Sequence, residues 1–145
     1  MHTLEQDFWK LDQRLSTSSP IPTYRFKNLI GISPYEWIHP VKQKKIHSLV
    51  TALLEEDCRH LISHIIVFGS ATTLFCDSYS DIDLVVLGYF DHFTTQIPLY
   101  KFGEVDLFGY NLKNFLVGKE SNTFYKNIWD KGVIVYEQLP TTSKK

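Results

Sequence analysis

The chain has 145 residues, with 15 Lys and Arg against 16 Asp and Glu, so its formal net charge is −1. This length predicts one compact domain, and an apolar share of 43% excludes a disordered or low-complexity chain. Because there is no basic surplus, we expect no tight nucleic-acid binding. The longest apolar stretches, Ile65–Phe68 and Leu84–Leu87, are far shorter than the roughly 18 residues of a membrane span, so we expect no membrane partner.

Cysteine usage and the first residues bear on the compartment. Cys58 and Cys76 have neither metal-like nor disulfide-like spacing. Residues 1–7 lack the basic and apolar regions of a secretion signal. A reducing cytoplasm is therefore the simplest expectation.

Residues 1–40 are expected to form an N-terminal helical appendage or arm. Apolar residues recur at helical spacing over 4–15, which predicts an amphipathic helix. The Ser- and Pro-rich segment 16–22 predicts a linker. Ser33–Glu36 is a capping box with Pro at the first helical position, which predicts a short helix before Pro40.

Residues 41–137 are predicted to form the core, an α/β (α+β) fold with a small mixed sheet of about four strands and flanking helices on at least one face. The first helix of this core should keep Lys42 off its apolar stripe. Residues 138–145 are expected to be a flexible tail. The patterns predict these elements, in chain order: a helix over 41–57, a strand over 62–68, a short helix from Ser70 to Cys76, strands over 81–87 and 104–108, two helices capped by Asn111 and Ser121, the second ending at Gly132, and a strand over 133–136.

The chemically informative stretch begins where the first strand ends. Gly69-Ser70 makes a tight turn there, and Asp81 and Asp83 open the next strand. Alternation along a strand places both aspartates on one face, with Cα atoms about 6.6 Å apart. Carboxylates at that range repel and raise each other's pKa unless a cation lies between them. Oxygen ligands of this kind are those that Mg²⁺ prefers.

A second acidic pair, Glu104 and Asp106, shares a face of the third predicted strand, and either residue could supply a third ligand. Three carboxylates can hold two metal ions about 3.5–4 Å apart. Gly69 lets the backbone approach a ligand closely, and Ser70 offers its hydroxyl and amide to a phosphate. An Asp-x-Asp pair alone is weak evidence, since it also occurs on solvated strands, in glycosyltransferases and in phosphatases of the haloacid dehalogenase type. The strand that continues after Asp83 disfavours the phosphatase interpretation.

The chain resembles the core of the polymerase-β-like nucleotidyltransferase superfamily, most of all its minimal single-domain bacterial members. The resemblance covers about residues 45–137 and leaves 1–40 outside. The chain departs from the common pattern at Ala71–Leu74, where many members have Arg and Gly, so a guanidinium that could clamp a phosphate is missing. The resemblance is carried by Phe68-Gly69-Ser70, Ser80-Asp81-Ile82-Asp83-Leu84, Glu104-Val105-Asp106-Leu107 and the ending Lys131–Glu137.

The resemblance implies a nucleotidyltransferase fold and a role for each matching residue. Gly69 and Ser70 would bind the nucleotide phosphates, and Thr72 and Thr73 of the same turn are assigned to nucleotide binding with them. Asp106 would be the third metal ligand and the base toward the acceptor hydroxyl, with Glu104 as second choice. The catalytic residues, which would also ligate two Mg²⁺ ions, are Asp81, Asp83 and Asp106.

The implied activity is transfer of a nucleoside monophosphate from an NTP, with ATP favoured, to an acceptor hydroxyl. The acceptor would be a partner protein or a small molecule such as an antibiotic. Because 145 residues leave little room for a region that shapes the acceptor site, a second chain is expected: a homodimer, or a helical HEPN-type partner that some such proteins adenylylate on tyrosine. The alternative is a non-catalytic nucleotide-binding or antitoxin module of a toxin–antitoxin pair.

Overall fold

The computed structural model describes residues 34–74 and 76–138. The predicted helix over 4–15, the linker over 16–22 and the tail from residue 139 lie outside the described residues. Within the described ranges, no helix combines the length and the apolar composition that a membrane span requires.

Four strands form one mixed sheet in the order β3-β2-β1-β4. Strand β1 runs antiparallel to both β2 and β4, whereas β2 and β3 run parallel. This confirms the predicted α+β class and the mixed sheet of four strands. The strands are β1 (Ile62–Phe68), β2 (Ile82–Gly88), β3 (Val105–Asn111) and β4 (Val133–Glu137).

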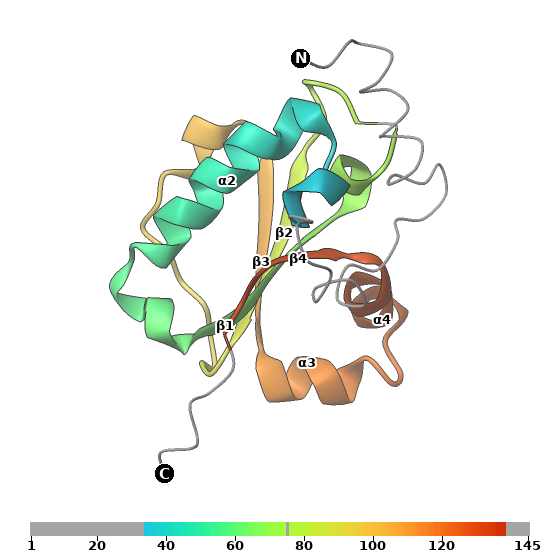
Figure 1. Ribbon diagram of the computed structural model, residues 1–145. Helices are drawn as coiled ribbons and strands as arrows, with labels where there is room; N and C mark the ends of the chain where they lie inside the picture. Colours follow the sequence, from blue (N-terminus) through green and yellow to red (C-terminus); the bar gives the residue numbers. More distant parts are fainter. Residues whose placement is uncertain (1–33, 75, 139–145) are drawn as a thin grey trace.

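Helices cover both faces of the sheet, where the sequence predicted at least one (Figure 1). One face carries α2 (Pro40–Leu54); the other carries α3 (Leu112–Gly118) and α4 (Thr123–Lys131). Short 3-10 turns join these elements: η2 (Pro34–Trp37), η3 (Asp57–Leu61), η4 (Gly69–Thr72) and η5 (Leu99–Phe102).

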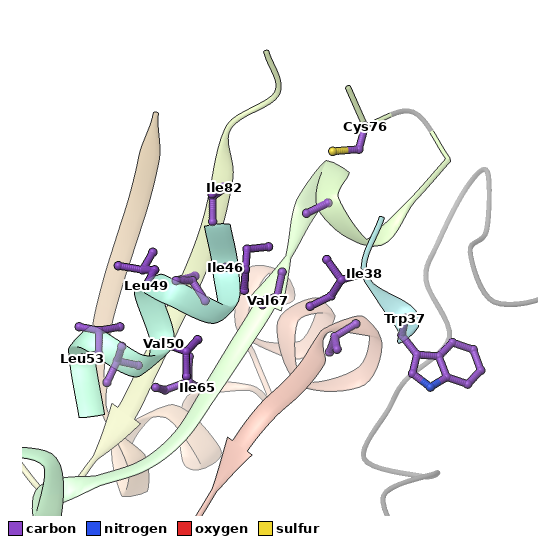
Figure 2. Packing of buried hydrophobic residues seen from close by; sticks show 14 of the residues in the cluster. Trp37, Ile38, Ile46, Leu49, Val50, Leu53, Ile65, Val67, Cys76 and Ile82 are labelled. Carbon is purple, nitrogen blue, oxygen red and sulfur yellow. The ribbon is translucent and has the colours of Figure 1, made fainter. Parts of the chain in front are cut away.

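The face under α2 holds the larger apolar core. Figure 2 shows the α2 side chains lying over β1, and the spacing of these residues is the helical pattern that predicted the element. Each fully buried Leu or Ile contributes about 1.5–3 kcal/mol to stability. The buried apolar residues of α2 are Ile46, Leu49, Val50 and Leu53.

Lys42 of α2 is buried, so the expectation that it lies off the apolar stripe is wrong. Its residue is only 4% exposed, and its Nζ donates to the Ser78 carbonyl over 3.2 Å. The long methylene stem of a lysine packs along apolar surface while the ammonium reaches a polar partner. Here that partner is the loop that leads into β2.

The core begins before residue 41. Trp37 and Ile38 are buried in the cluster under α2, and the His39 amide donates to the Ala71 carbonyl over 2.7 Å. The turn η2 lies where a short helix was predicted before Pro40. The described part of the expected arm therefore packs as core.

Two local predictions are wrong. The helix expected from Ser70 to Cys76 is only the turn η4, because Thr72 and Thr73 donate their hydroxyls to the carbonyls three residues back. Asn122, and not Ser121, caps α4, with its Oδ1 accepting from the Tyr125 amide.

Candidate functional site

One end of the sheet gathers the predicted site. Because β2 and β3 are parallel and β1 is antiparallel to β2, three chain segments meet at the same end of the sheet. They are the start of β2, the start of β3 and the end of β1. Asp83 is the second residue of β2, Asp106 the second of β3, and Gly69 follows the last residue of β1. The topology therefore joins the Gly-Ser turn to two of the predicted carboxylates.

Asp83 and Asp106 are direct register partners across the β2–β3 pair. They lie on the α3/α4 face, since Val85 and Phe108, two residues further along each strand, pack in that cluster. Asp83 is half-buried and Asp106 is exposed. The pair presents two carboxylates side by side at the rim of the sheet.

The environment of this pair disfavours the charged form of Asp83. Burial raises the pKa of Asp83 from 3.8 to about 6, and the hydrogen bond with Asp106, the charge of Asp106 and the charge of Asp81 act in the same direction. Below about pH 6 the Asp83 carboxyl is protonated and can donate a hydrogen bond to Asp106. Above it, two like charges lie in contact, which a divalent cation would relieve.

The Gly69 backbone packs directly against the Asp83 side chain. Its φ is +78°, a conformation that favours glycine. A Cβ placed there would lie 2.2 Å from Asp83 Oδ2, so a larger residue would displace the carboxylate. The glycine is thus required both by the turn and by the carboxylate opposite it.

Asp81 and Glu104 lie just outside the strands. Asp81 is exposed and precedes β2, yet its charge contributes to the raised pKa of Asp83. Glu104 is exposed and precedes β3, with its carbonyl accepting from the Ile82 amide over 2.8 Å. Register therefore aligns Asp106, and not Glu104, with Asp83.

The rest of the Gly-Ser turn divides into exposed and structural groups. Ser70 is partly exposed. Thr72 is buried and donates to the Gly69 carbonyl over 2.8 Å, and Thr73 donates to the Ser70 carbonyl over 2.9 Å. Both hydroxyls stabilise the turn itself. Thr72, predicted from the sequence to bind nucleotide, is fully buried and offers no side-chain surface to a ligand.

The loop over 76–80 connects the Gly-Ser turn to Asp81 and is held by hydrogen bonds. Asp77 Oδ1 accepts from the Tyr79 amide over 2.8 Å. Burial raises the pKa of the Cys76 thiol. Hydrogen bonds with the Ser80 and Ser70 hydroxyls and the charge of the nearby Lys42 ammonium act in the opposite direction. This loop therefore links the Gly-Ser turn, α2 and the start of β2.

The donor chemistry of the pair suits Mg²⁺, which takes one or two protein carboxylates and completes its shell with water and phosphate oxygens. A metal site built from protein ligands alone is not found among the described residues. Across residues 34–74 and 76–138, no three His, Cys, Asp or Glu side chains gather into a group that could hold a metal. The residues present thus fit an ion shared with a ligand.

A second polar group, around His64, is structural. His64 is buried, with Nδ1 2.9 Å from Ser63 Oγ and Nε2 3.4 Å from Glu137 Oε2. The Ser63 hydroxyl donates to the Leu87 carbonyl, so it is committed to the sheet.

The sequence reasoning missed an aromatic cluster beside the carboxylates. Phe68 is the register partner of Asp83 on the side opposite Asp106. Phe124 of α4 contacts both Phe68 and Phe108, with ring centroids 5.8 Å apart in each case. Phe68 and Phe108 could have been found from their spacing to Gly69 and Asp106, but nothing in the sequence placed Phe124 over them.

Comparison with known proteins gives no assignment: no protein-family model matches the chain, and neither the curated proteins nor the solved structures contain a significant match.

Proposed function

We propose that this protein is a Mg²⁺-dependent nucleotidyltransferase that transfers a nucleoside monophosphate from an NTP, with ATP as the favoured donor, to an acceptor hydroxyl. The observation that carries the proposal is the register pairing of Asp83 with Asp106 beside the close-packed Gly69 backbone. This arrangement provides adjacent carboxylates for a cation and an open backbone turn for phosphates at one sheet edge.

Each residue has a distinct task in the proposed reaction. Gly69 and Ser70 would hold the phosphates, and Asp83 and Asp106 would hold the metal, with the nearby Asp81 carboxylate adding negative charge. Mg²⁺, when bound, would neutralise phosphate charge and lower the pKa of the acceptor hydroxyl. The acceptor oxygen forms a bond to the α-phosphorus, the bond from that phosphorus to the bridging oxygen breaks, and pyrophosphate leaves. The acceptor proton passes to the Asp106 carboxylate.

The raised pKa of Asp83 also supports a functional role, since strongly perturbed groups concentrate at sites of binding and catalysis. A carboxylate pair kept in contact costs stability. The acceptor is proposed to be a hydroxyl of a partner protein or of a small molecule, completed by a second chain, either a homodimer or a helical HEPN-type partner.

Two observations favour a second candidate, a non-catalytic nucleotide-binding or antitoxin module. The described residues contain no ready three-ligand metal group, and Ala71–Leu74 lacks an arginine. Such a module would bind nucleotide and Mg²⁺ without turnover.

The test combines calorimetric titration of the full chain with Mg²⁺ and ATP and a pyrophosphate-release assay over hydroxylated acceptors. We expect binding, and release that disappears in Asp83→Asn and Asp106→Asn. Asp91→Asn, which removes an exposed carboxylate from the loop after β2, is the matched control and should retain both. Binding without release on any acceptor would favour the module, and absence of binding would contradict both functions.

A further inference from the structure

An aromatic wall borders the carboxylate pair on the α3/α4 face. Across the sheet, Phe68, Asp83 and Asp106 form one row of register partners. Phe108 lies two residues beyond Asp106 on the same face. The polar rim of the site thus adjoins aromatic side chains, with Phe68 directly preceding the Gly69 turn.

Phe124 stands over this wall with part of its ring free. It lies at the second position of α4 and meets Phe68 at 84° and Phe108 at 71°, both edge-to-face contacts. The side chain is nevertheless 42% exposed. Edge-on packing against two neighbours fixes the orientation of the ring and leaves solvent in contact with the remainder.

We propose that Phe124 is the platform on which the nucleobase of the bound nucleotide stacks. The inference rests on the proposed function, because it takes the phosphates to lie at Gly69 and Ser70. A base joined to those phosphates through one ribose lies within reach of the side chain that contacts Phe68, the neighbour of Gly69. An aromatic ring held rigidly by its neighbours suits stacking, since no rotamer freedom is lost on binding.

The chemistry of the platform predicts its selectivity. A phenylalanine ring offers a π-face and no hydrogen-bonding group, so it discriminates by stacking area and not by base edges. Stacking on this ring therefore gives no preference between ATP and GTP and favours both over CTP and UTP, so the proposed preference for ATP has to come from other contacts. This weak discrimination is a property of the side chain at this position.

The test separates base contacts from phosphate contacts by calorimetry of the full chain with Mg²⁺ and ATP, GTP or inorganic tripolyphosphate. Phe124→Ala and Phe124→Leu should weaken ATP and GTP binding about tenfold and leave tripolyphosphate unchanged. Phe124→Trp should retain nucleotide affinity. Val117→Ala, at a 66% exposed apolar position on α3, is the matched control and should change neither ligand.

The outcomes are distinguishable. Equal losses for ATP and tripolyphosphate would mean that Phe124 only supports the fold, and unchanged ATP affinity in Phe124→Ala would mean that the base lies elsewhere; either result overturns the inference. A change in acceptor KM alone would assign the ring to an acceptor and would also overturn it. If the unaltered protein binds neither ligand, the proposed function itself fails.

Discussion

Replacing Asp83 by asparagine should stabilise the fold at neutral pH, because it removes a charge that folding places in an unfavourable environment. The introduced side-chain amide would mimic the protonated carboxyl and can donate to Asp106. A pKa raised from 3.8 to about 6 corresponds to about 3 kcal/mol at 1.36 kcal/mol per pH unit. Since Asp83 is only half-buried, solvent screening reduces this to about 1 kcal/mol.

The sign of the effect follows from linkage. Below pH 3.8 the carboxyl is protonated in both folded and unfolded chains, so Asp83 costs nothing. As the pH rises from 3.8 to about 6, the unfolded chain ionises first and the folded state loses stability. The cost is complete above pH 6. For a chain of this length, 1 kcal/mol corresponds to a melting-temperature change of about 3 °C.

Thermal denaturation of both proteins at pH 4 and at pH 8 provides the measurement. Asp83→Asn should melt about 3 °C higher than the unaltered protein at pH 8 and at nearly the same temperature at pH 4. Millimolar Mg²⁺ should narrow the difference at pH 8 by stabilising the unaltered protein. The reasoning is refuted if the variant melts lower at pH 8, or if the difference is the same at both pH values.

Three further substitutions test other parts of the fold and site. Gly69→Ala should abolish nucleotide binding and lower the free energy of unfolding by more than 1 kcal/mol in urea titration, because backbone strain and a steric clash add. Gly103→Ala is the control: its φ is +89° and its Cβ would lie no closer than 3.7 Å to another side chain, so it should show the strain alone. Asn122→Ala should cost about 1 kcal/mol in urea unfolding, whereas Ser121→Ala should cost nothing measurable, and equal effects would contradict the assigned cap. Phe115→Ala, which empties a fully buried site, should lower stability by about 3–5 kcal/mol, and a loss below 1 kcal/mol would contradict the packing.

The strands and the long helix could be predicted because their burial follows from the order of apolar and polar residues in the sequence. Strand β1 is buried on both faces along 62–67, so its sequence is almost continuously apolar, with Ser63 and His64 as the exceptions. The helix α2 keeps a single apolar stripe. Local competition for backbone groups was harder to predict: Thr72 and Thr73 close a 3-10 turn where a longer helix was expected, and Lys42 is buried because a distant loop carbonyl accepts from it.

The site depends on strand register, which the sequence does not encode locally. Alternation places Glu104 and Asp106 on the same face, so both are compatible with a ligand role beside Asp83. A two-residue slip between β2 and β3 would exchange them without moving any apolar side chain to the wrong face. The observed register pairs Leu84 with Leu107 and Asp83 with Asp106, and this pairing decides which carboxylate meets Asp83. The register of two neighbouring strands thus determines the geometry of the polar site, and it places two like charges side by side where a cation would relieve their repulsion.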